Sequence, residues 1–193
     1  MRTQLLSDQE LVNQYLAGNE LALERLILRH KDRVYTALYM MLKDEYLAED
    51  FFQETFIKAI ETLRAGRYND EGKFGPWLAR IAYNMCIDHF RKIKRMPGVV
   101  NSGGDDIFKY MKFEETPIDE HIQLEHFEGK LKDLIDQLPE EQKEVVILRH
   151  FFNFSFKEVS EYTNSPINTC LGRMRYALIR LRKMMEEQNM VLK

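Results

Sequence analysis

The chain has 193 residues, of which 45% are hydrophobic and 31% charged, and its formal net charge is −3 at pH 7. This composition supports buried cores and excludes a wholly disordered chain, and no apolar run approaches the ~20 residues that a membrane-spanning helix needs. The polar start of the chain lacks the pattern of an export signal, so we expect a cytoplasmic protein without direct membrane insertion. A chain of this length forms one ordinary domain or two small ones.

Apolar residues recur at intervals of three and four along most of the chain, which predicts an all-α protein. Ser7 and Glu10 have the spacing of a capping box that begins a first helix, and Asn19 begins a second. A third helix should end at Gly66, because glycine readily adopts the left-handed conformation that closes helices. A fourth should run to about Arg95, before a Met-Pro-Gly sequence stops it.

Residues 97–116 are rich in turn-forming and charged residues, which predicts a flexible linker. We therefore expect two small helical domains, 1–96 and 117–193, joined by this linker. Helices should resume near Pro117 and again after Pro139. The second domain should contain a helix-turn-helix, winged-helix-like but without strands.

The predicted helix-turn-helix lies near the end of the chain. Ser155 and Glu158 form a second capping box, a turn follows at 163–165, and a basic final helix runs to about Glu187. In such a unit the second helix enters the DNA major groove. The stripe of this helix that we expect to pack consists of Ile167, Cys170, Met174, Leu178, Leu181 and Met185.

The other faces of the final helix carry polar and basic residues. Basic side chains neutralise phosphates, and an Asn or Arg near the start of such a helix can read base edges. An ordinary solvated helix with a basic face remains the alternative. The candidate DNA-binding residues are Asn168, Thr169, Gly172, Arg173 and Tyr176.

The fourth predicted helix interleaves aromatic and basic residues. Rings stack on unpaired bases, with about 1–3 kcal/mol per base, and cations follow the backbone, so this helix suits opened DNA. The alternative is that some of the apolar residues are simply core. The candidates are Trp77, Arg80, Tyr83, Asn84, Arg91 and Lys92.

An acidic cluster in the third predicted helix contains Asp50, Gln53 and Glu54, with Phe51 close by. No histidine or second carboxylate motif accompanies it, so a protein-docking face is a better interpretation than a catalytic pair. The chain has no complete nucleophile, phosphate-loop or metal-ligand motif, and its two cysteines lie far apart. We therefore expect neither enzyme activity, nor a metal site, nor a cofactor.

Three of these segments, in this order, resemble bacterial RNA polymerase sigma factors of the extracytoplasmic-function (ECF) subfamily. LAEDFFQETFIKAI (Leu47–Ile60) is similar to the polymerase-binding helix of that family. FGPWLARIAYNMCIDHFRKIKR (Phe74–Arg95) is similar to its promoter-melting and downstream-recognition helix. Residues 138–183, from LPEEQ to RLRK, are similar to its final domain, which binds the upstream promoter element and a flap of the polymerase.

By position, the resemblance implies that Asp50, Gln53 and Glu54 contact the clamp of the large polymerase subunit, and that Asn84 lies near a flipped base. The final helix should face the upstream element. Core RNA polymerase and promoter DNA, both duplex and melted strand, are the expected partners, and an anti-sigma factor is a further one. The expected function is promoter recognition and opening in transcription initiation.

The chain departs from the family in its recognition helix. Where the family usually has Val-Lys-Ser-Arg, residues 170–173 are Cys-Leu-Gly-Arg, which lacks a phosphate-binding lysine and a small hydroxyl. The promoter sequence therefore does not follow from the resemblance. Two other interpretations stay open at this point: a stand-alone helix-turn-helix transcription regulator, which leaves the Trp77 cluster without a role, and a helical adapter that binds only proteins.

Overall fold

A computed structural model describes residues 6–69, 72–95 and 123–188. Within these residues every regular element is a helix and no strand occurs, which confirms the all-α fold. The chain divides into two compact units, Met1–Ile107 and Phe108–Lys193. The predicted linker, residues 97–116, and the predicted helix start near Pro117 lie outside the described residues.

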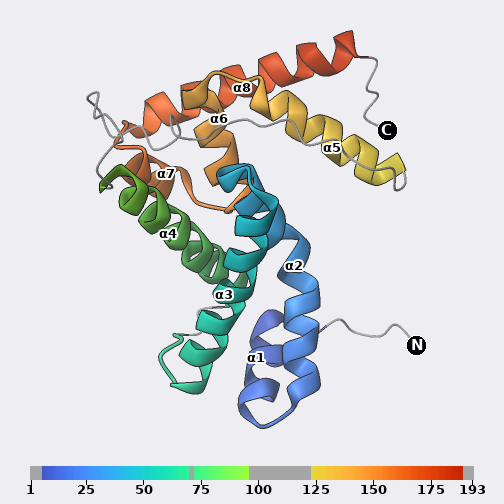
Figure 1. The fold of residues 1–193 in the computed structure, drawn as a ribbon, viewed down its shortest axis with the longest axis vertical. Helices are drawn as coiled ribbons and strands as arrows, with labels where there is room; N and C mark the ends of the chain where they lie inside the picture. The colour runs from blue at the N-terminus through green and yellow to red at the C-terminus, as the bar shows by residue number, and fades with distance from the viewer. Residues whose placement is uncertain (1–5, 70–71, 96–122, 189–193) are drawn as a thin grey trace. The chain divides into compact units, whose positions relative to one another are not determined.

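In the described part of the first unit there are four helices, drawn from blue to green in Figure 1. The Ser7 side chain accepts a hydrogen bond from the Glu10 N–H in the predicted capping box, and the Asn19 side chain caps the second helix. Gly66 has a φ of 63° after the third helix, as its position predicted. The helices are α1 (Asp8–Leu16), α2 (Glu20–Leu42), α3 (Glu45–Arg64) and α4 (Phe74–Arg95).

α2 joins the start of the chain to the start of α4. The Asp8 carboxylate lies 2.9 Å from Nε2 of His30 and 2.6 Å from the Arg29 guanidinium. On its other side the His30 ring packs against the Phe74 ring, with centroids 5.4 Å apart. A Cβ atom on Gly75 would lie 3.1 Å from Cε1 of His30, so a larger residue there would crowd the ring and require it to shift. α1, α2 and the first turn of α4 are therefore fitted together around one imidazole.

Residues 123–188 of the second unit form five helical elements, and α5 and α6 both pack against α8. The predicted Ser155–Glu158 capping box is present, and Asn164 closes the following turn with a φ of 48°. A π-helical turn after α6 was not predicted, because periodicity does not distinguish it from an α-helix. The elements are α5 (Gln123–Asp136), α6 (Glu140–Val146), η2 (Ile147–Phe151), α7 (Phe156–Tyr162) and α8 (Ile167–Glu187).

The buried stripe of α8 differs from the predicted one. Leu178 and Ile167 are 55% and 44% exposed, so the prediction that both pack in the core is wrong. The small side chain of Ala177 is fully buried where α8 lies against its neighbours, and this turns the larger Leu178 outward. The residues that do lie in the core are Cys170, Ala177, Leu181 and Met185.

The Ser155 capping box allows a test of the second unit alone. Ser155→Ala removes the acceptor for the Glu158 N–H and should lower the free energy of unfolding by ~1 kcal/mol. The exposed Lys157→Ala is the control and should change it by less than about 0.5 kcal/mol. Urea unfolding followed by circular dichroism measures the loss, whereas the fluorescence of Trp77, the one tryptophan, reports the first unit and should not change.

Candidate nucleic-acid and protein interfaces

The outer face of α3 is acidic. Asp50, Gln53 and Glu54 are all exposed, in agreement with a docking role. The amide of Gln53 donates a hydrogen bond of 3.2 Å to Glu49, and the Glu54 carboxylate pairs with Lys58 at 3.1 Å, one turn further on. Exposed pairs of this kind contribute little to stability, so these side chains are available to a partner.

Phe51 lies behind this acidic face. Its half-buried ring meets the His89 ring edge to face, with centroids 5.5 Å apart, and so connects α3 to α4. The backbone oxygen of Phe51 also accepts a hydrogen bond of 2.6 Å from the hydroxyl of the buried Thr55. Phe51 therefore packs between helices, and the polar residues beside it form the outward surface.

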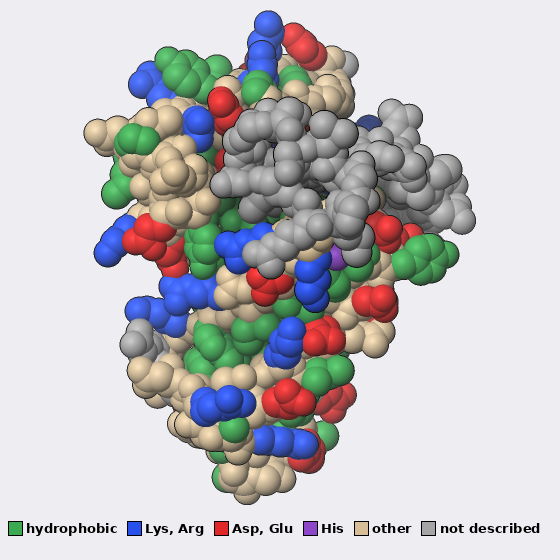
Figure 2. Space-filling view, turned by 60° about the vertical axis from the view of Figure 1, so that its left-hand side comes forward, with side chains coloured by type: hydrophobic (Ala, Val, Ile, Leu, Met, Phe, Trp, Pro, Cys, Tyr) green, Lys and Arg blue, Asp and Glu red, His purple; other side chains and the backbone are tan. Residues whose placement is uncertain are grey.

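α4 places several predicted DNA-binding residues on one face. At 100° per residue, Trp77, Arg80, Asn84 and Arg91 fall within about 60° of one another. Arg80, Asn84 and Arg91 are exposed, and Trp77 is half-buried. Lys92, also exposed, lies beside this set. Figure 2 brings forward the side on which Figure 1 draws α4, and it shows Lys and Arg side chains around a hydrophobic patch.

The Trp77 indole is supported from one side by two rings. Its centroid lies 4.5 Å from that of Tyr68 and 5.5 Å from that of Phe74. Phe74 is 2% exposed, so the cluster extends from the core to the surface. Tyr68 was not identified from the sequence, because it lies in the loop between α3 and α4 outside any periodic pattern. A supported, partly exposed ring is suited to stacking on an unpaired base.

Tyr83 does not belong to this surface. Its side chain is 2% exposed, and it lies on the buried stripe of α4 with Leu78, Ala82 and Cys86. The sequence prediction that Tyr83 contacts DNA is therefore not supported by its position. Aromatic character alone did not distinguish a core ring from a stacking ring. Around the helix axis, Tyr83 lies about 120° from Trp77 and about 100° from Asn84.

Two histidines in the first unit have lowered pKa values. Burial of His30 lowers its pKa below the usual 6.5, and this effect exceeds the opposing attraction of Asp8. Burial also lowers the pKa of His89, with a further contribution from nearby Lys92 and an opposing one from Asp44. Both rings favour the neutral form in the folded protein.

The turn between α7 and α8 is held by side-chain hydrogen bonds. The Ser160 hydroxyl donates to the backbone oxygen of Ser165 at 2.7 Å, and the Ser165 hydroxyl donates to that of Thr163 at 3.1 Å. Buried Cys170 lies 3.6 Å from the Thr163 hydroxyl. The two helices thus have a fixed arrangement, which a helix-turn-helix needs to present its second helix to DNA.

The predicted recognition residues of α8 are mostly outward. Asn168, Thr169 and Tyr176 are exposed, the last at 63%. A Cβ on Gly172 would meet no atom within 4 Å, so this position is open to the outside and no internal contact requires glycine there. Arg173 differs from the others, because its side chain is only 22% exposed.

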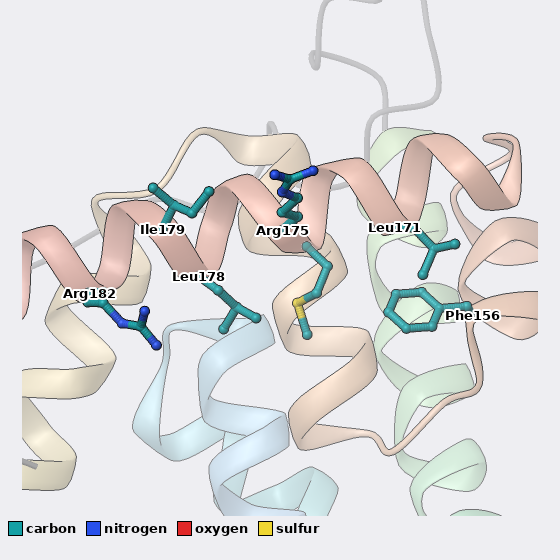
Figure 3. Close-up of a pocket in the computed structure, with 7 residues that line it drawn as sticks. Phe156, Leu171, Arg175, Leu178, Ile179 and Arg182 are labelled. Carbon is teal, nitrogen blue, oxygen red and sulfur yellow. The ribbon is translucent and has the colours of Figure 1, made fainter.

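A neighbouring face of α8 forms an apolar groove. In Figure 3, Leu171 lies next to Phe156 of α7, and Leu178 projects to the same side of α8 as Leu171. Arg175 and Arg182 also line the groove. Exposed apolar side chains in such a group suit a protein surface better than a phosphate backbone. This groove was missed because Leu178 was assigned to the core.

Among the described residues, no group of three or more His, Cys, Asp or Glu side chains could hold a metal ion. None of the helices in this part of the chain combines the length and apolar character needed to cross a membrane. Burial strongly raises the pKa of the Cys86 thiol, which disfavours a reactive thiolate.

Both units match known protein families. Residues 26–96 match the Sigma-70 region 2 family, and residues 128–181 match the Sigma-70 region 4 family. RNA polymerase sigma factor CarQ of Myxococcus xanthus is 30% identical over 146 residues, which cover 74% of this chain and 76% of CarQ. The ECF RNA polymerase sigma factor SigW of Bacillus subtilis is 28% identical over 181 residues, covering 91% and 95%. The chain belongs to the ECF sigma factors.

Solved structures support the same fold for this sigma factor. CnrH, solved with the cytosolic domain of CnrY, matches with a TM-score of 0.56 and 19% identity, covering 93% of this chain and 97% of CnrH. The sigma factor RpoE of Bartonella quintana, solved with the anti-sigma factor NepR, matches with a TM-score of 0.55 and 20% identity, covering 85% and 96%. Both likenesses bear on the fold only.

Family membership decides between the interpretations left open by the sequence. As an ECF sigma factor, the protein directs promoter-specific transcription initiation by RNA polymerase, and it binds core polymerase and promoter DNA. The interpretations of the chain as a stand-alone regulator or as a protein-binding adapter are therefore rejected. The region 2 match contains α3 and α4 and begins within α2, and the region 4 match contains α7, the following turn and α8 as far as residue 181.

The two histidines with lowered pKa values predict how the stability of region 2 depends on pH. Because both pKa values are lower in the folded than in the unfolded state, the unfolded chain binds more protons once the pH falls through about 6.5. Stability should therefore decrease as the pH falls from about 7.5, until the folded-state pKa values are passed. His30→Gln with His89→Gln should flatten this decrease.

Trp77 fluorescence in urea, repeated from about pH 7.5 to 5, measures the effect for region 2. His150→Gln is the control, because His150 is exposed and lies in the other unit. A pH dependence as steep in the double variant as in the wild type would show that other groups cause it.

Proposed function

We propose that this sigma factor works through three separate surfaces of two domains, 1–96 and 117–193, with residues 97–116 as the connection. The observation that carries the proposal is the common face of α4 that holds Trp77, Arg80, Asn84 and Arg91. A ring supported from one side, with an amide and two guanidinium groups beside it, matches the chemistry of a single DNA strand.

The acidic face of α3 is the proposed contact with the clamp of core polymerase. Asp50, Gln53 and Glu54 are exposed and offer carboxylate and amide oxygens to a basic partner. Phe51 supports this face from behind through its contact with His89, and we assign it packing rather than direct binding. Charge complementarity of this kind steers association and fixes the register of the complex.

The exposed part of α8 is the proposed reader of the upstream promoter element. Asn168, Thr169, Gly172 and Tyr176 lie near its N-terminal half and face outward. Pro166 precedes the helix and gives it no side-chain cap, so the positive end of the helix dipole adds to the attraction for phosphates. Asn168 has the donor and acceptor pair that recognises adenine in the major groove.

An anti-sigma factor is a further proposed partner. The related folds of CnrH and RpoE were each solved with a partner chain, named as an anti-sigma factor in the second case. We also propose a cytoplasmic, non-catalytic protein, because the work assigned to all three surfaces is binding and takes place on the polymerase.

Neutralising the acidic face should weaken polymerase binding. Asp50→Asn with Glu54→Gln removes two charges without changing side-chain size, and we expect a loss in affinity for core polymerase of about tenfold that shrinks at high salt. The control pair is Glu24→Gln with Glu61→Gln, which removes two exposed charges elsewhere. Fluorescence anisotropy of labelled protein titrated with core enzyme measures the affinity. Equal affinity of the two pairs would reject the assignment.

Altering the α4 face should impair promoter opening more than promoter binding. Trp77→Leu or Arg80→Ala should reduce run-off transcription and permanganate reactivity of the melted region about tenfold, the amount that corresponds to one lost base contact. On a template opened beforehand by mismatches the defect should be smaller. The exposed Lys31→Ala is the control for Arg80→Ala. Full activity of both variants on closed promoters would overturn the role of α4.

A further inference from the structure

Arg173 lies where α6, the turn and α8 meet. Its Nη1 donates a hydrogen bond of 3.0 Å to the Ser165 hydroxyl, and its Nη2 lies 3.6 Å from the Glu141 carboxylate in the first turn of α6. The guanidinium therefore links α8 and the turn directly before it to α6, which lies earlier in the sequence. At 22% exposure the side chain is mostly withdrawn from solvent.

Ser165 is a suitable anchor for this arginine because its other groups are already held. Its hydroxyl donates to Thr163, which leaves the oxygen lone pairs to accept from Arg173. Its backbone oxygen accepts from the Ser160 hydroxyl at 2.7 Å, and its N–H donates to the backbone oxygen of Ser160 at 3.2 Å. Arg173 thus binds a point of the turn that is fixed against α7.

The same contacts argue against a phosphate role for Arg173. A phosphate would have to compete with the Ser165 hydroxyl for Nη1 and would meet the negative charge of Glu141 beside Nη2. At 100° per residue, Arg173 lies about 140° from Asn168 but only about 40° from Thr169, so it borders the outward face of α8. Its guanidinium nevertheless contacts Ser165 and Glu141, and the side chain is only 22% exposed.

We propose that Arg173 is a positioning residue, which fixes the orientation of α8 relative to α6 and the turn so that the outward residues meet the base edges. This inference rests on the proposed function of α8 as the reader of the upstream element. Recognition geometry tolerates displacements of about 0.5 Å, so a loosened helix loses sequence-specific contacts. Phosphate contacts are long-range and depend less on orientation, so non-specific binding is retained.

Binding of holoenzyme to duplex DNA at several salt concentrations tests the proposal. One duplex is enriched from a random library by wild-type holoenzyme, and the other is a scrambled duplex of equal length. Arg173→Met keeps an apolar stem but removes both polar contacts. It should weaken binding to the enriched duplex about tenfold and leave both the salt dependence and the binding to the scrambled duplex unchanged.

Three further variants sharpen the test. Arg173→Lys, which keeps the charge and one donor group, should restore part of the lost specificity. Ser165→Ala should reproduce part of the loss, because the arginine then keeps only Glu141. Lys130→Met removes an exposed cation from α5 and should change nothing. Thermal unfolding of each variant shows that the second unit remains folded at the assay temperature.

The possible outcomes are distinct. A shallower salt dependence in Arg173→Met, by about 0.9 in the slope of log affinity against log salt, would show a lost phosphate contact and overturn the proposal. A lower melting temperature with full discrimination between the duplexes would show a merely structural role and also overturn it. If Ser165→Ala and Arg173→Met reduce discrimination but not the slope, the proposal holds. If the wild type does not prefer its enriched duplex, the proposed function of α8 fails, and this inference fails with it.

Discussion

Each helix in this protein buries one stripe and leaves the rest of its surface outside, and this constraint determines where binding residues can lie. In α4, Leu78, Ala82 and Cys86 are buried in the core. The face that carries Trp77, Arg80 and Arg91 therefore lies toward solvent. In α3, Ala48 and Ala59 are buried and the carboxylates face out. The same 3.6-residue period that builds the core of region 2 thus separates its two outward surfaces.

The contacts between α3 and α4 also make those surfaces parts of one rigid body. The Phe51 ring meets His89, and the hydroxyl of Thr55 lies 3.7 Å from the sulfur of Met85 in α4. These contacts hold the acidic face and the Trp77 face at a fixed separation. The proposed roles of the two surfaces require this rigidity, because docking through α3 would then determine where α4 receives the strand.

Much of the fold could be predicted because its boundaries depend on local chemistry. The capping boxes at Ser7 and Ser155 and the glycine at residue 66 involve only residues within one or two helical turns, so they can be recognised from the sequence alone. The burial of Tyr83, the exposure of Leu178 and the π-helical turn at 147–151 depend on which neighbours a helix meets, and a single helical pattern does not contain that information. Arg173 shows the same limit, since its partner Glu141 lies 32 positions away in the sequence.

The imidazole of His30 lies between Asp8 of α1 and Phe74 in the first turn of α4, and so helps to position α4. Asp8 lies 2.9 Å from Nε2 of this ring, and the absence of a side chain at residue 75 leaves room for the adjacent Cε1 atom. Residues of α1 and α2 therefore help to position the first turn of α4, which carries Trp77. A larger residue at position 75 would crowd the imidazole, so the proposed strand-binding surface depends on a position that lies in none of the proposed binding sets.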